Sequence, residues 1–380
     1  MAAPDVLVIG GGVFGLWCAR ACLGRGLSVV VADPAAGAGA SGTPVGALAP
    51  MSPVGWSPLK ALQLEGLLTL PAAVAAVEAE TGLSAGYAQP GRLVALADAA
   101  ARGRAEAQVA ACGNWGKAGR MEILETPPDP RVLSPAVAEA GVQHDTLTGR
   151  IDTEAYLAAL RTAVGKGAEI RAARCDGLVP GGAVLDGEAV AAGSVVLAAG
   201  AATLALAGFG APPGEKGQAA VLAGTLPEGA PVLTGRGQYV VAHGPGRVGV
   251  GSTAEKRWET PGPDAQLNAV IARVRTACPA LAEAPVVRRW AGVRPRAPRP
   301  GPMVGALPER PNVWVATGGH RIGFALAHLV GEAVAAGLAE AEDGPKLPFC
   351  TMPAQHLTPL CAEDAGKAGS GTENGPKRAR

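Results

Sequence analysis

The sequence predicts an α/β protein, α+β overall, in which parallel and antiparallel sheet alternate along 380 residues. Residues 5–33 have the pattern of a strand, a glycine turn, a helix and a second strand. Residues 194–199 form a continuous apolar run that ends at Gly200, which is typical of a parallel strand covered on both faces. Residues 217–253 contain short strands separated by glycine turns, which indicates antiparallel sheet.

The first 33 residues have the order of a dinucleotide-binding βαβ unit. Gly10 permits a tight turn out of the strand, Gly12 lets the backbone approach a pyrophosphate, and Gly15 lets the helix pack closely on the sheet. Asp33 ends the second strand, 18 residues beyond Gly15, where a carboxylate can accept from both ribose hydroxyls. It favours FAD or NAD over NADP, whose 2′-phosphate it would repel. We therefore expect a discontinuous Rossmann-like domain.

The glycine pattern alone is weak, because glycine makes up 55 of 380 residues and a GxGxxG is expected about once by chance. Two further matches occur. The match at Gly37 follows no strand directly, and the match at Gly244 lies between two short Val-rich runs, as in a hairpin. Only the match at Gly10 has strand, turn, helix, strand and acid in order.

The composition favours a small-molecule partner. The 33 basic and 32 acidic side chains leave a net charge of +1, which argues against nucleic acid or an anionic membrane. Seven cysteines without a CxxC pair fit a reducing compartment, and Cys18 and Cys22 are interpreted as packing residues, so no metal site is predicted. The first apolar run is short and follows no cationic segment, so we expect neither a signal peptide nor a transmembrane segment. A cytoplasmic protein is expected, and the sequence leaves open whether it is a homo-oligomer.

Residues 34–58 form a loop too long for a simple connection, and long ordered loops are usually functional. Asp152 is the expected N-cap of a helix. The remaining elements are predicted as follows: helices at 60–80 (ending at Gly82), 102–111, 153–164, 265–277 and 323–342; strands at 92–97, 169–172 and 312–316; a proline-rich loop at 127–135. Residues 346–380 are expected to be a C-terminal extension, disordered beyond about 362.

Shorter motifs follow the βαβ unit in a defined order: GASG at 39–42 continuing to GAL at 46–48, residues 149–152 before a helix, AAG at 198–200, KGQ at 216–218, WAGVRP at 290–295 and GGHRIG at 318–323. In order and spacing they resemble the FAD-dependent D-amino-acid oxidase superfamily, most closely its glycine oxidase and sarcosine oxidase-like branch. The resemblance covers residues 5 to 345, and no match to the cysteine motif of covalent sarcosine oxidases is present. It therefore implies non-covalent FAD.

The resemblance also implies which residues hold the cofactor. The N-terminal unit would hold adenosine and pyrophosphate, the loop after it would run along the isoalloxazine, and the start of the last helix would face the flavin pyrimidine. A helix N-terminus there favours the negative charge of reduced flavin. The implied cofactor residues are Gly10, Gly12, Val13, Phe14, Gly15, Asp33, Pro34, Ser41, Gly42, Gly46, Ala47, Leu48, Gly200, Arg321, Ile322, Gly323 and Phe324.

For the substrate, the resemblance implies that Arg294 clamps a carboxylate, that Tyr239 donates to the same carboxylate, and that Arg321 is a second arginine of the pocket. A guanidinium suits this because two parallel bonds fix orientation as well as place. From composition alone Arg294 is one more cation in a basic run, and Tyr239 is equally well explained as a core aromatic. His320 and His328 receive no catalytic role, since the family mechanism needs no histidine base.

The chain departs from the family pattern at two places. The family usually has an acidic residue shortly after the Arg-Pro dipeptide, where Ala297, Pro298 and Arg299 stand, and a proline where His328 stands. The fold is unaffected, but the substrate is less well defined.

The implied activity is oxidation of the Cα–N bond of a small amino acid or secondary amine of the glycine, D-amino acid or sarcosine type. Hydride passes to flavin, the imino acid hydrolyses to a 2-oxo acid, and oxygen accepts the electrons to give peroxide. The alternatives are a D-amino-acid dehydrogenase with another acceptor and a non-catalytic FAD-binding module. An NAD-dependent dehydrogenase leaves the later glycine motifs unexplained. The FAD-binding domain is expected to comprise residues 1–85, 145–215 and 286–345, and the substrate domain residues 86–144 and 216–285.

Overall fold

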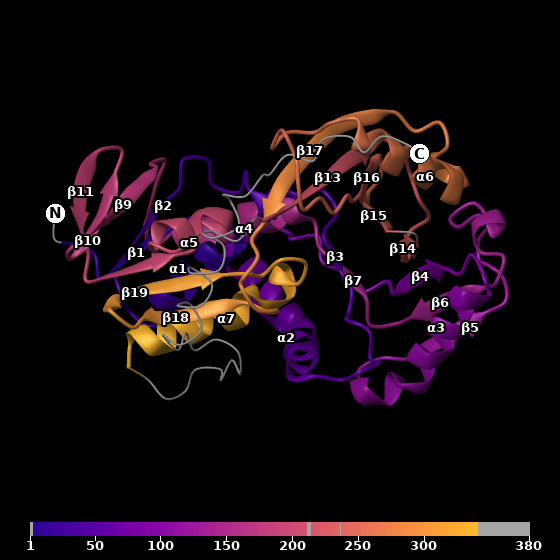
Figure 1. Cartoon of the computed structure of the whole chain (residues 1–380), viewed down its shortest axis with the longest axis horizontal. Helices are drawn as coiled ribbons and strands as arrows, with labels where there is room; N and C mark the ends of the chain where they lie inside the picture. The colour runs from indigo at the N-terminus through magenta and orange to yellow at the C-terminus, as the bar shows by residue number, and fades with distance from the viewer. Residues whose placement is uncertain (1–2, 211–213, 236, 341–380) are drawn as a thin grey trace, which may run out of the picture.

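The computed structural model describes residues 3–210, 214–235 and 237–340. Two large sheets lie side by side in Figure 1, a six-stranded sheet on the left and an eight-stranded sheet on the right. A two-stranded ribbon, β3 (Ala47–Leu48) with β7 (Gly149–Arg150), lies between them. The predicted C-terminal extension, 346–380, lies outside the described residues.

The six-stranded sheet is parallel except at one edge, in the order β18-β19-β12-β1-β2-β8. Val8 of the first strand pairs with Val31 on one side and Val196 on the other. The apolar run that was predicted as a parallel strand is β12, and all but its first residue are buried. The strands are β1 (Val6–Ile9), β2 (Val29–Ala32), β8 (Glu169–Arg171), β12 (Ser194–Leu197), β18 (Met303–Leu307) and β19 (Arg310–Thr317).

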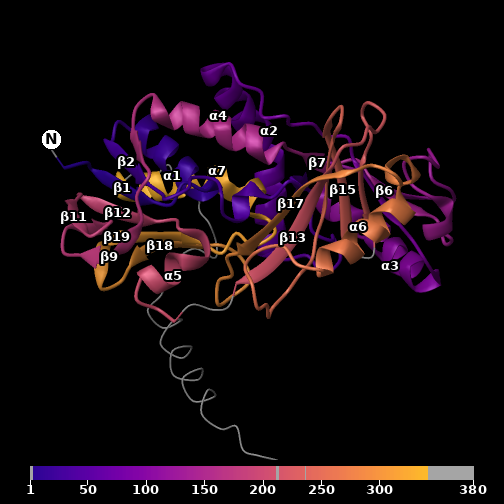
Figure 2. The ribbon, with the colours of Figure 1, turned by 90° about the horizontal axis from the view of Figure 1, so that it is seen from above.

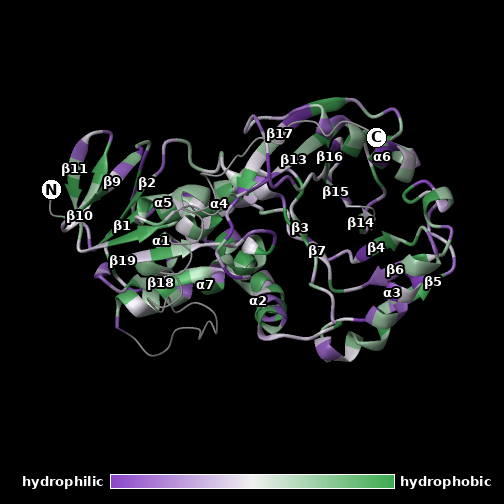
Figure 3. Cartoon of the chain, in the orientation of Figure 1, coloured by the Kyte–Doolittle hydropathy of each residue, from purple (hydrophilic) through white to green (hydrophobic). Residues whose placement is uncertain are grey.

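Four helices cover one face of this sheet: α1 (Val13–Gly24), α2 (Pro58–Thr81), α4 (Thr153–Gly165) and α7 (Gly323–Leu338). Helix α1 packs against both α4 and α7, and its apolar character is visible in Figure 3. The predicted cap of α4 is confirmed, since the Asp152 carboxylate accepts hydrogen bonds from the backbone amides of Glu154 and Ala155. Gly82 ends α2 in the left-handed conformation, as predicted.

A three-stranded meander covers the opposite face of the parallel sheet, where the sequence analysis predicted no element. It consists of β9 (Cys175–Val179), β10 (Gly182–Leu185) and β11 (Glu188–Ala191). Figure 2 shows the meander and the short helix α5 (Thr203–Leu206) on the side of the sheet away from α4. Asp186 and Gly187 both have positive φ in the tight turn between β10 and β11, so an Asp-Gly hairpin signal was present in the sequence.

The eight-stranded sheet confirms the predicted antiparallel passage, with one parallel pair between β14 and β4. Helix α6 (Gln266–Ala277) packs on one face, and the other face looks toward α2 and the parallel sheet. Helix α3 (Ala99–Ala110) begins before the predicted residue 102, because the carboxylate of Asp98 caps it. The strands are β4 (Arg92–Ala95), β5 (Met121–Leu124), β6 (Val142–Asp145), β13 (Glu215–Leu222), β14 (Val232–Gly235), β15 (Gln238–Gly244), β16 (Arg247–Gly251) and β17 (Val286–Arg294).

Sheet membership corrects one predicted domain limit. The expected FAD-binding segment 286–345 begins with β17, but β17 pairs with β13 along its whole length in the eight-stranded sheet. No propensity or periodicity distinguishes a strand of one sheet from a strand of the other, so the limit could not be found from sequence. We propose the same two-domain division with this limit moved from 286 to about 294.

Helix α2 is the one described helix that is long and apolar enough by composition to cross a membrane. It packs against α4 and α7, and seven of its residues are buried in the core. Its hydropathy is therefore explained by packing within the molecule.

His328 is a buried residue of α7, and the two side chains that it contacts, Thr69 and Trp17, are uncharged. Its Nε2 atom lies 2.7 Å from the Thr69 hydroxyl, and its ring packs edge-on against Trp17 at a centroid distance of 5.9 Å. Burial lowers the pKa of His328 to about 4. The histidine is thus a neutral packing residue at neutral pH.

We predict that His328 makes the fold acid-sensitive. Between pH 6.5 and 4 the unfolded chain binds a proton that the folded chain excludes, so the free energy of unfolding falls as the pH falls through this window. The loss is about 2 kcal/mol at pH 5. In His328→Gln this component disappears, measured by urea unfolding at pH 7 and pH 5. His144→Gln, at the surface beside Glu122, is the matched control and keeps the decline. An unchanged decline in His328→Gln would contradict the assignment.

Candidate active site

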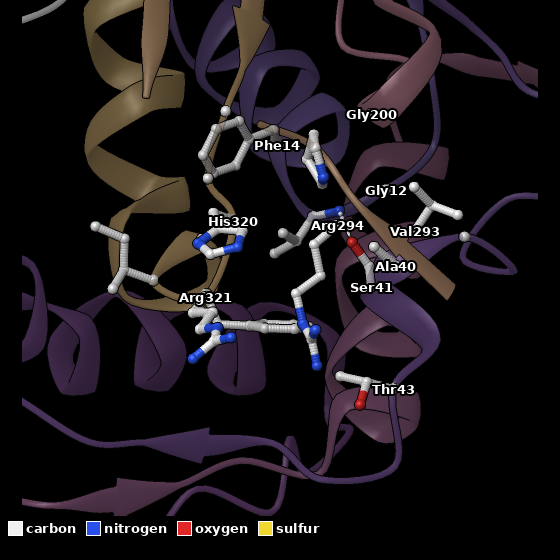
Figure 4. Close-up of a pocket in the computed structure, with 18 of the residues that line it drawn as sticks. Gly12, Phe14, Ala40, Ser41, Thr43, Gly200, Val293, Arg294, His320 and Arg321 are labelled. Atoms are coloured by element: carbon white, nitrogen blue, oxygen red, sulfur yellow. Dashed lines mark hydrogen bonds between the residues drawn. The ribbon is translucent and has the colours of Figure 1, made fainter. Parts of the chain in front are cut away.

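A single cavity of about 980 Å³ joins the glycine turn of the parallel sheet to the open face of the antiparallel sheet. At one end it is lined by Asp33 and Gly12, and at the other by Arg294 and Tyr239. Figure 4 shows Gly12 and Arg294 in this cavity. The following predicted site residues line it: Gly12, Val13, Phe14, Asp33, Ser41, Gly46, Ala47, Gly200, Tyr239, Arg294, Arg321, Ile322, Gly323 and Phe324. The volume is at the upper end of the range for cofactor and ligand sites.

The three glycines of the first turn are needed for different structural reasons. Gly10 has φ +116°, and a Cβ there would lie 2.3 Å from the carbonyl oxygen of Ala198. A Cβ at Gly15 would lie 1.8 Å from the carbonyl oxygen of Gly10. At Gly12, which starts α1, a Cβ would meet only the Ser41 hydroxyl at 3.2 Å. Gly10 and Gly15 are therefore required by packing, whereas Gly12 keeps the cavity open at the helix N-terminus.

Asp33 lies at the end of β2 and is held in place from two sides. Its carboxylate accepts hydrogen bonds from the backbone amides of Gly11 and Ala35, each at 2.7 Å. The long loop then returns to the same turn, since the Ser41 hydroxyl accepts from the amide of Val13 at 3.1 Å. The acid, the loop and the N-terminus of α1 thus surround one end of the cavity, which fits a ribose and a diphosphate.

Five predicted cofactor residues do not line the cavity: Gly10, Gly15, Pro34, Gly42 and Leu48. Four have packing causes: Gly10, Gly15, Gly42 and Leu48. The backbone of Gly42 passes so close to Gly37 that a Cβ would lie 2.6 Å from its carbonyl oxygen, and Leu48 is buried in the core. The predicted roles of these residues stay predictions.

The start of α7 forms the wall between the two ends of the cavity. No side chain caps this helix, and its first residues follow the turn after β19. A Cβ at Gly323 would meet nothing closer than the Phe14 ring at 3.7 Å, so the space beside Gly323 is open. A flat ring placed there would face the helix N-terminus.

Arg294 is the last residue of β17 and lies across the backbone of β13. A Cβ at Gly217 would lie 2.1 Å from its guanidinium. The guanidinium donates to the Ser252 hydroxyl at 2.8 Å and to the Thr253 carbonyl at 3.2 Å. Burial lowers the pKa of Arg294, and the positive charge of Arg321 lowers it further, but a guanidinium stays protonated at neutral pH. Arg294 is therefore a fixed, mostly buried cation.

Glu215 is a charged residue of this site that the sequence analysis missed. It pairs directly opposite Arg294 between β13 and β17, and its side chain is 8% exposed. Its Oε1 atom accepts from Arg294 at 3.2 Å, from Arg321 at 2.8 Å, and lies 3.2 Å from His320 Nε2. Burial raises the pKa of Glu215, but the hydrogen bond and charge of Arg321 and the charge of Arg294 outweigh this and leave it below its usual value. The acid is ionised at neutral pH.

The signal that could have found Glu215 is cross-strand register. Glu215 stands immediately before the KGQ motif, and only the pairing of β13 with β17 brings it opposite Arg294. Register between segments some eighty residues apart cannot be read from one sequence.

His320 and Tyr239 complete this end of the cavity. Burial lowers the pKa of His320, although the charge of Glu215 opposes the shift, so its ring is neutral at pH 7. Tyr239 lies on β15, packs against the cluster that contains Trp290, and lines the cavity. It is thus both a packing aromatic and a cavity residue. Figure 4 shows His320, Arg321 and Arg294 gathered in one part of the cavity.

Known proteins resemble the chain along nearly its whole length. A family model described as FAD dependent oxidoreductase matches residues 5–336. A glycine oxidase of Pseudomonas putida is 35% identical over 98 residues, which are 25% of this chain and 27% of that protein. A glycine oxidase of Geobacillus kaustophilus is 29% identical over 363 residues, 87% of this chain and 92% of that protein. The crystal structure of glycine oxidase from Geobacillus kaustophilus has a TM-score of 0.83 at 25% identity, covering 93% of this chain and 99% of that one.

The chain therefore belongs to the family of FAD-dependent oxidoreductases, and the predicted family, fold class and cofactor are confirmed. The match to the Pseudomonas putida relative spans about a quarter of that protein. The cavity fits FAD on independent grounds: an open helix N-terminus at Gly12, a fixed carboxylate at Asp33, and free space beside Gly323.

Gly12 and Gly15 provide a matched pair of tests. In Gly15→Ala the Cβ meets backbone that cannot move without separating α1 from β1, so the apoprotein is expected to lose about 3 kcal/mol of unfolding free energy. In Gly12→Ala we expect a loss below about 1 kcal/mol, but an affinity for FAD at least about tenfold weaker, since the Cβ takes cavity space. Urea unfolding of apoprotein and titration with FAD measure the two effects. Equal effects of both substitutions on unfolding would contradict this division.

Proposed function

We propose that this member of the FAD-dependent oxidoreductase family oxidises the Cα–N bond of a small amino acid or secondary amine. The supporting observation is the position of Arg294, a buried cation at one end of the cavity whose other end holds Asp33 and the α1 N-terminus. The relatives named glycine oxidase also favour this class of substrate. When bound, FAD supplies the acceptor for the hydride that leaves the α-carbon.

Each end of the cavity has a proposed part in binding. Asp33 accepts from the ribose, and the N-terminus of α1 at Gly12 holds the pyrophosphate, while the Val13 amide donates to the Ser41 hydroxyl. Residues 321–324 approach the flavin pyrimidine, where a helix N-terminus favours negative charge. No covalent link to the flavin is proposed.

At the substrate end, Arg294 binds the carboxylate, and Tyr239 donates to it from β15 of the same sheet. Two parallel bonds from a guanidinium fix the carboxylate in one orientation, which sets the direction of the α-carbon hydrogen. Arg321 is exposed at the cavity rim and is held by Glu215, so its proposed part is secondary. His320 is neutral and supplies no proposed base.

Oxygen is the proposed electron acceptor, and the product is peroxide together with an imino acid that hydrolyses to a 2-oxo acid. A dehydrogenase with another acceptor and a non-catalytic FAD-binding module are the competing functions. A cytoplasmic location stays a prediction from the sequence, and so does the open question of a homo-oligomer.

Replacing Arg294 tests the substrate assignment. In Arg294→Ala we expect kcat/KM for the amino acid to fall about 10²- to 10³-fold, because a buried charged hydrogen-bonding partner is lost, while FAD is retained. Arg288→Ala is the matched control, an arginine of the same strand that is 44% exposed and pairs with Glu154. Steady-state kinetics and the flavin absorbance of the purified variants measure the outcome. A non-catalytic module would show no turnover in the wild type and no effect of either substitution.

The identity of the electron acceptor is tested by reducing the flavin without air and then reoxidising it. Under anaerobic conditions glycine, sarcosine and small D-amino acids are added in turn, and the absorbance near 450 nm is recorded. We expect at least one to bleach the flavin and air to restore the colour with formation of peroxide. Recovery only on addition of a quinone would assign the dehydrogenase instead. If no amine or amino acid bleaches the flavin, the proposed function is wrong.

A further inference from the structure

Glu215 lies behind the part of the cavity where a substrate carboxylate is expected, and its negative charge contacts three residues that line it, Arg294, Arg321 and His320. Arg294 and Arg321 contribute one positive charge each, and the half-buried His320 adds none at pH 8, because burial lowers its pKa below the usual value. Arg92 also lines the cavity, but its Nε atom donates to the buried carboxylate of Asp145 at 2.7 Å, so that pair is balanced internally. Two arginines and one glutamate leave a net charge of +1 at this end.

The glutamate is held in place by its strand and by both arginines. It is part of β13, its side chain is 8% exposed, and both arginines donate to the same oxygen, Oε1. Arg294 has further N–H groups that contact Ser252 and Thr253 at the cavity wall. A substrate carboxylate that binds Arg294 therefore leaves Glu215 as the counterion of Arg321.

We propose that Glu215 is a specificity-determining residue, an internal counterion that limits this pocket to substrates with one carboxylate. The inference rests on the proposed function of Arg294. One incoming carboxylate neutralises the net charge, whereas a second would lie beside Glu215 at the only other arginine of the cluster. Two negative charges that contact the same arginine in a partly buried site repel each other, and this repulsion disfavours binding of the second carboxylate. Amino dicarboxylates are thus excluded by an acid of the protein itself.

The test uses the FAD-loaded protein and two non-reacting probes, acetate and malonate, titrated by calorimetry at pH 8, where malonate is a dianion. We expect the wild type to bind acetate more tightly than malonate. In Glu215→Gln the dissociation constant of malonate is expected to fall at least tenfold and that of acetate less than threefold, so the preference reverses. Glu215→Asp retains the charge and is expected to retain the wild-type preference.

Glu154→Gln is the matched control. Glu154 is also shared by two arginines, Arg247 and Arg288, but it is 63% exposed and neither arginine lines the cavity, so its removal leaves the acetate-to-malonate ratio unchanged. If the wild type binds malonate more tightly than acetate, the inference is overturned, and no variant is needed to show it. An unchanged ratio in folded Glu215→Gln overturns it as well.

The outcomes separate this inference from the proposed function. If acetate binds to the wild type and Arg294→Ala abolishes that binding, the role of Arg294 stands whatever Glu215 does. If neither probe binds the wild type, or if Arg294→Ala binds both as well as the wild type does, the carboxylate role of Arg294 fails and the inference about Glu215 fails with it.

Discussion

The site depends on the parallel register of four neighbouring strands. In β2, β1, β12 and β19 every strand runs in the same direction, so their carboxyl ends meet at one edge of the sheet. Asp33, Gly10, Ala198 and Gly318 follow these ends, and each either lines the cavity or shapes its floor. Ligands of open parallel sheets bind at such an edge because only there do loops and helix N-termini converge. The glycine turn could not form a site without this register, since Gly10 packs directly on the carbonyl of Ala198.

The antiparallel sheet supplies the other half of the cavity by leaving part of one face without side chains. Gly217 on β13 and Gly292 on β17 are paired neighbours, and the side chains of Arg294 and Trp290 lie across them. A larger residue at either position would occupy the place of the guanidinium or of the indole. Arg294 is also the point at which the chain leaves this sheet, so the next residues, Pro295 onward, return toward the parallel sheet and its cavity edge.

Local signals in the sequence were sufficient for most elements but not for their assembly. The turn at Gly10, the cap at Asp152 and the end of α2 at Gly82 depend on residues within a few positions of each other, and each was predicted. The sheet to which β17 belongs and the contact between Glu215 and Arg294 depend on pairing across about eighty residues, for which a single chain carries no periodic signal. His328 was ambiguous for a different reason. In a sequence, a histidine of the core cannot be distinguished from a histidine of an active site, and only the contacts of His328 with Trp17 and Thr69 show that it is a packing residue.

The position of Glu215 is rigid because β13 is held by charges on both faces. Adjacent residues of a strand point to opposite sides, so Glu215 points toward the cavity-lining Arg294 and Arg321, while Lys216 points to the other side, where its Nζ atom lies 2.6 Å from Asp264, just before α6. The two networks meet at Thr253, whose carbonyl accepts from Arg294 and whose hydroxyl accepts from the amide of Gln218. Removing one partner of a buried charge leaves the other uncompensated, which costs more than the pair contributes. The pairing of β13 with β17 and the hydrogen bonds from both arginines hold this counterion beside the pocket, so its negative charge is part of the site that a substrate enters.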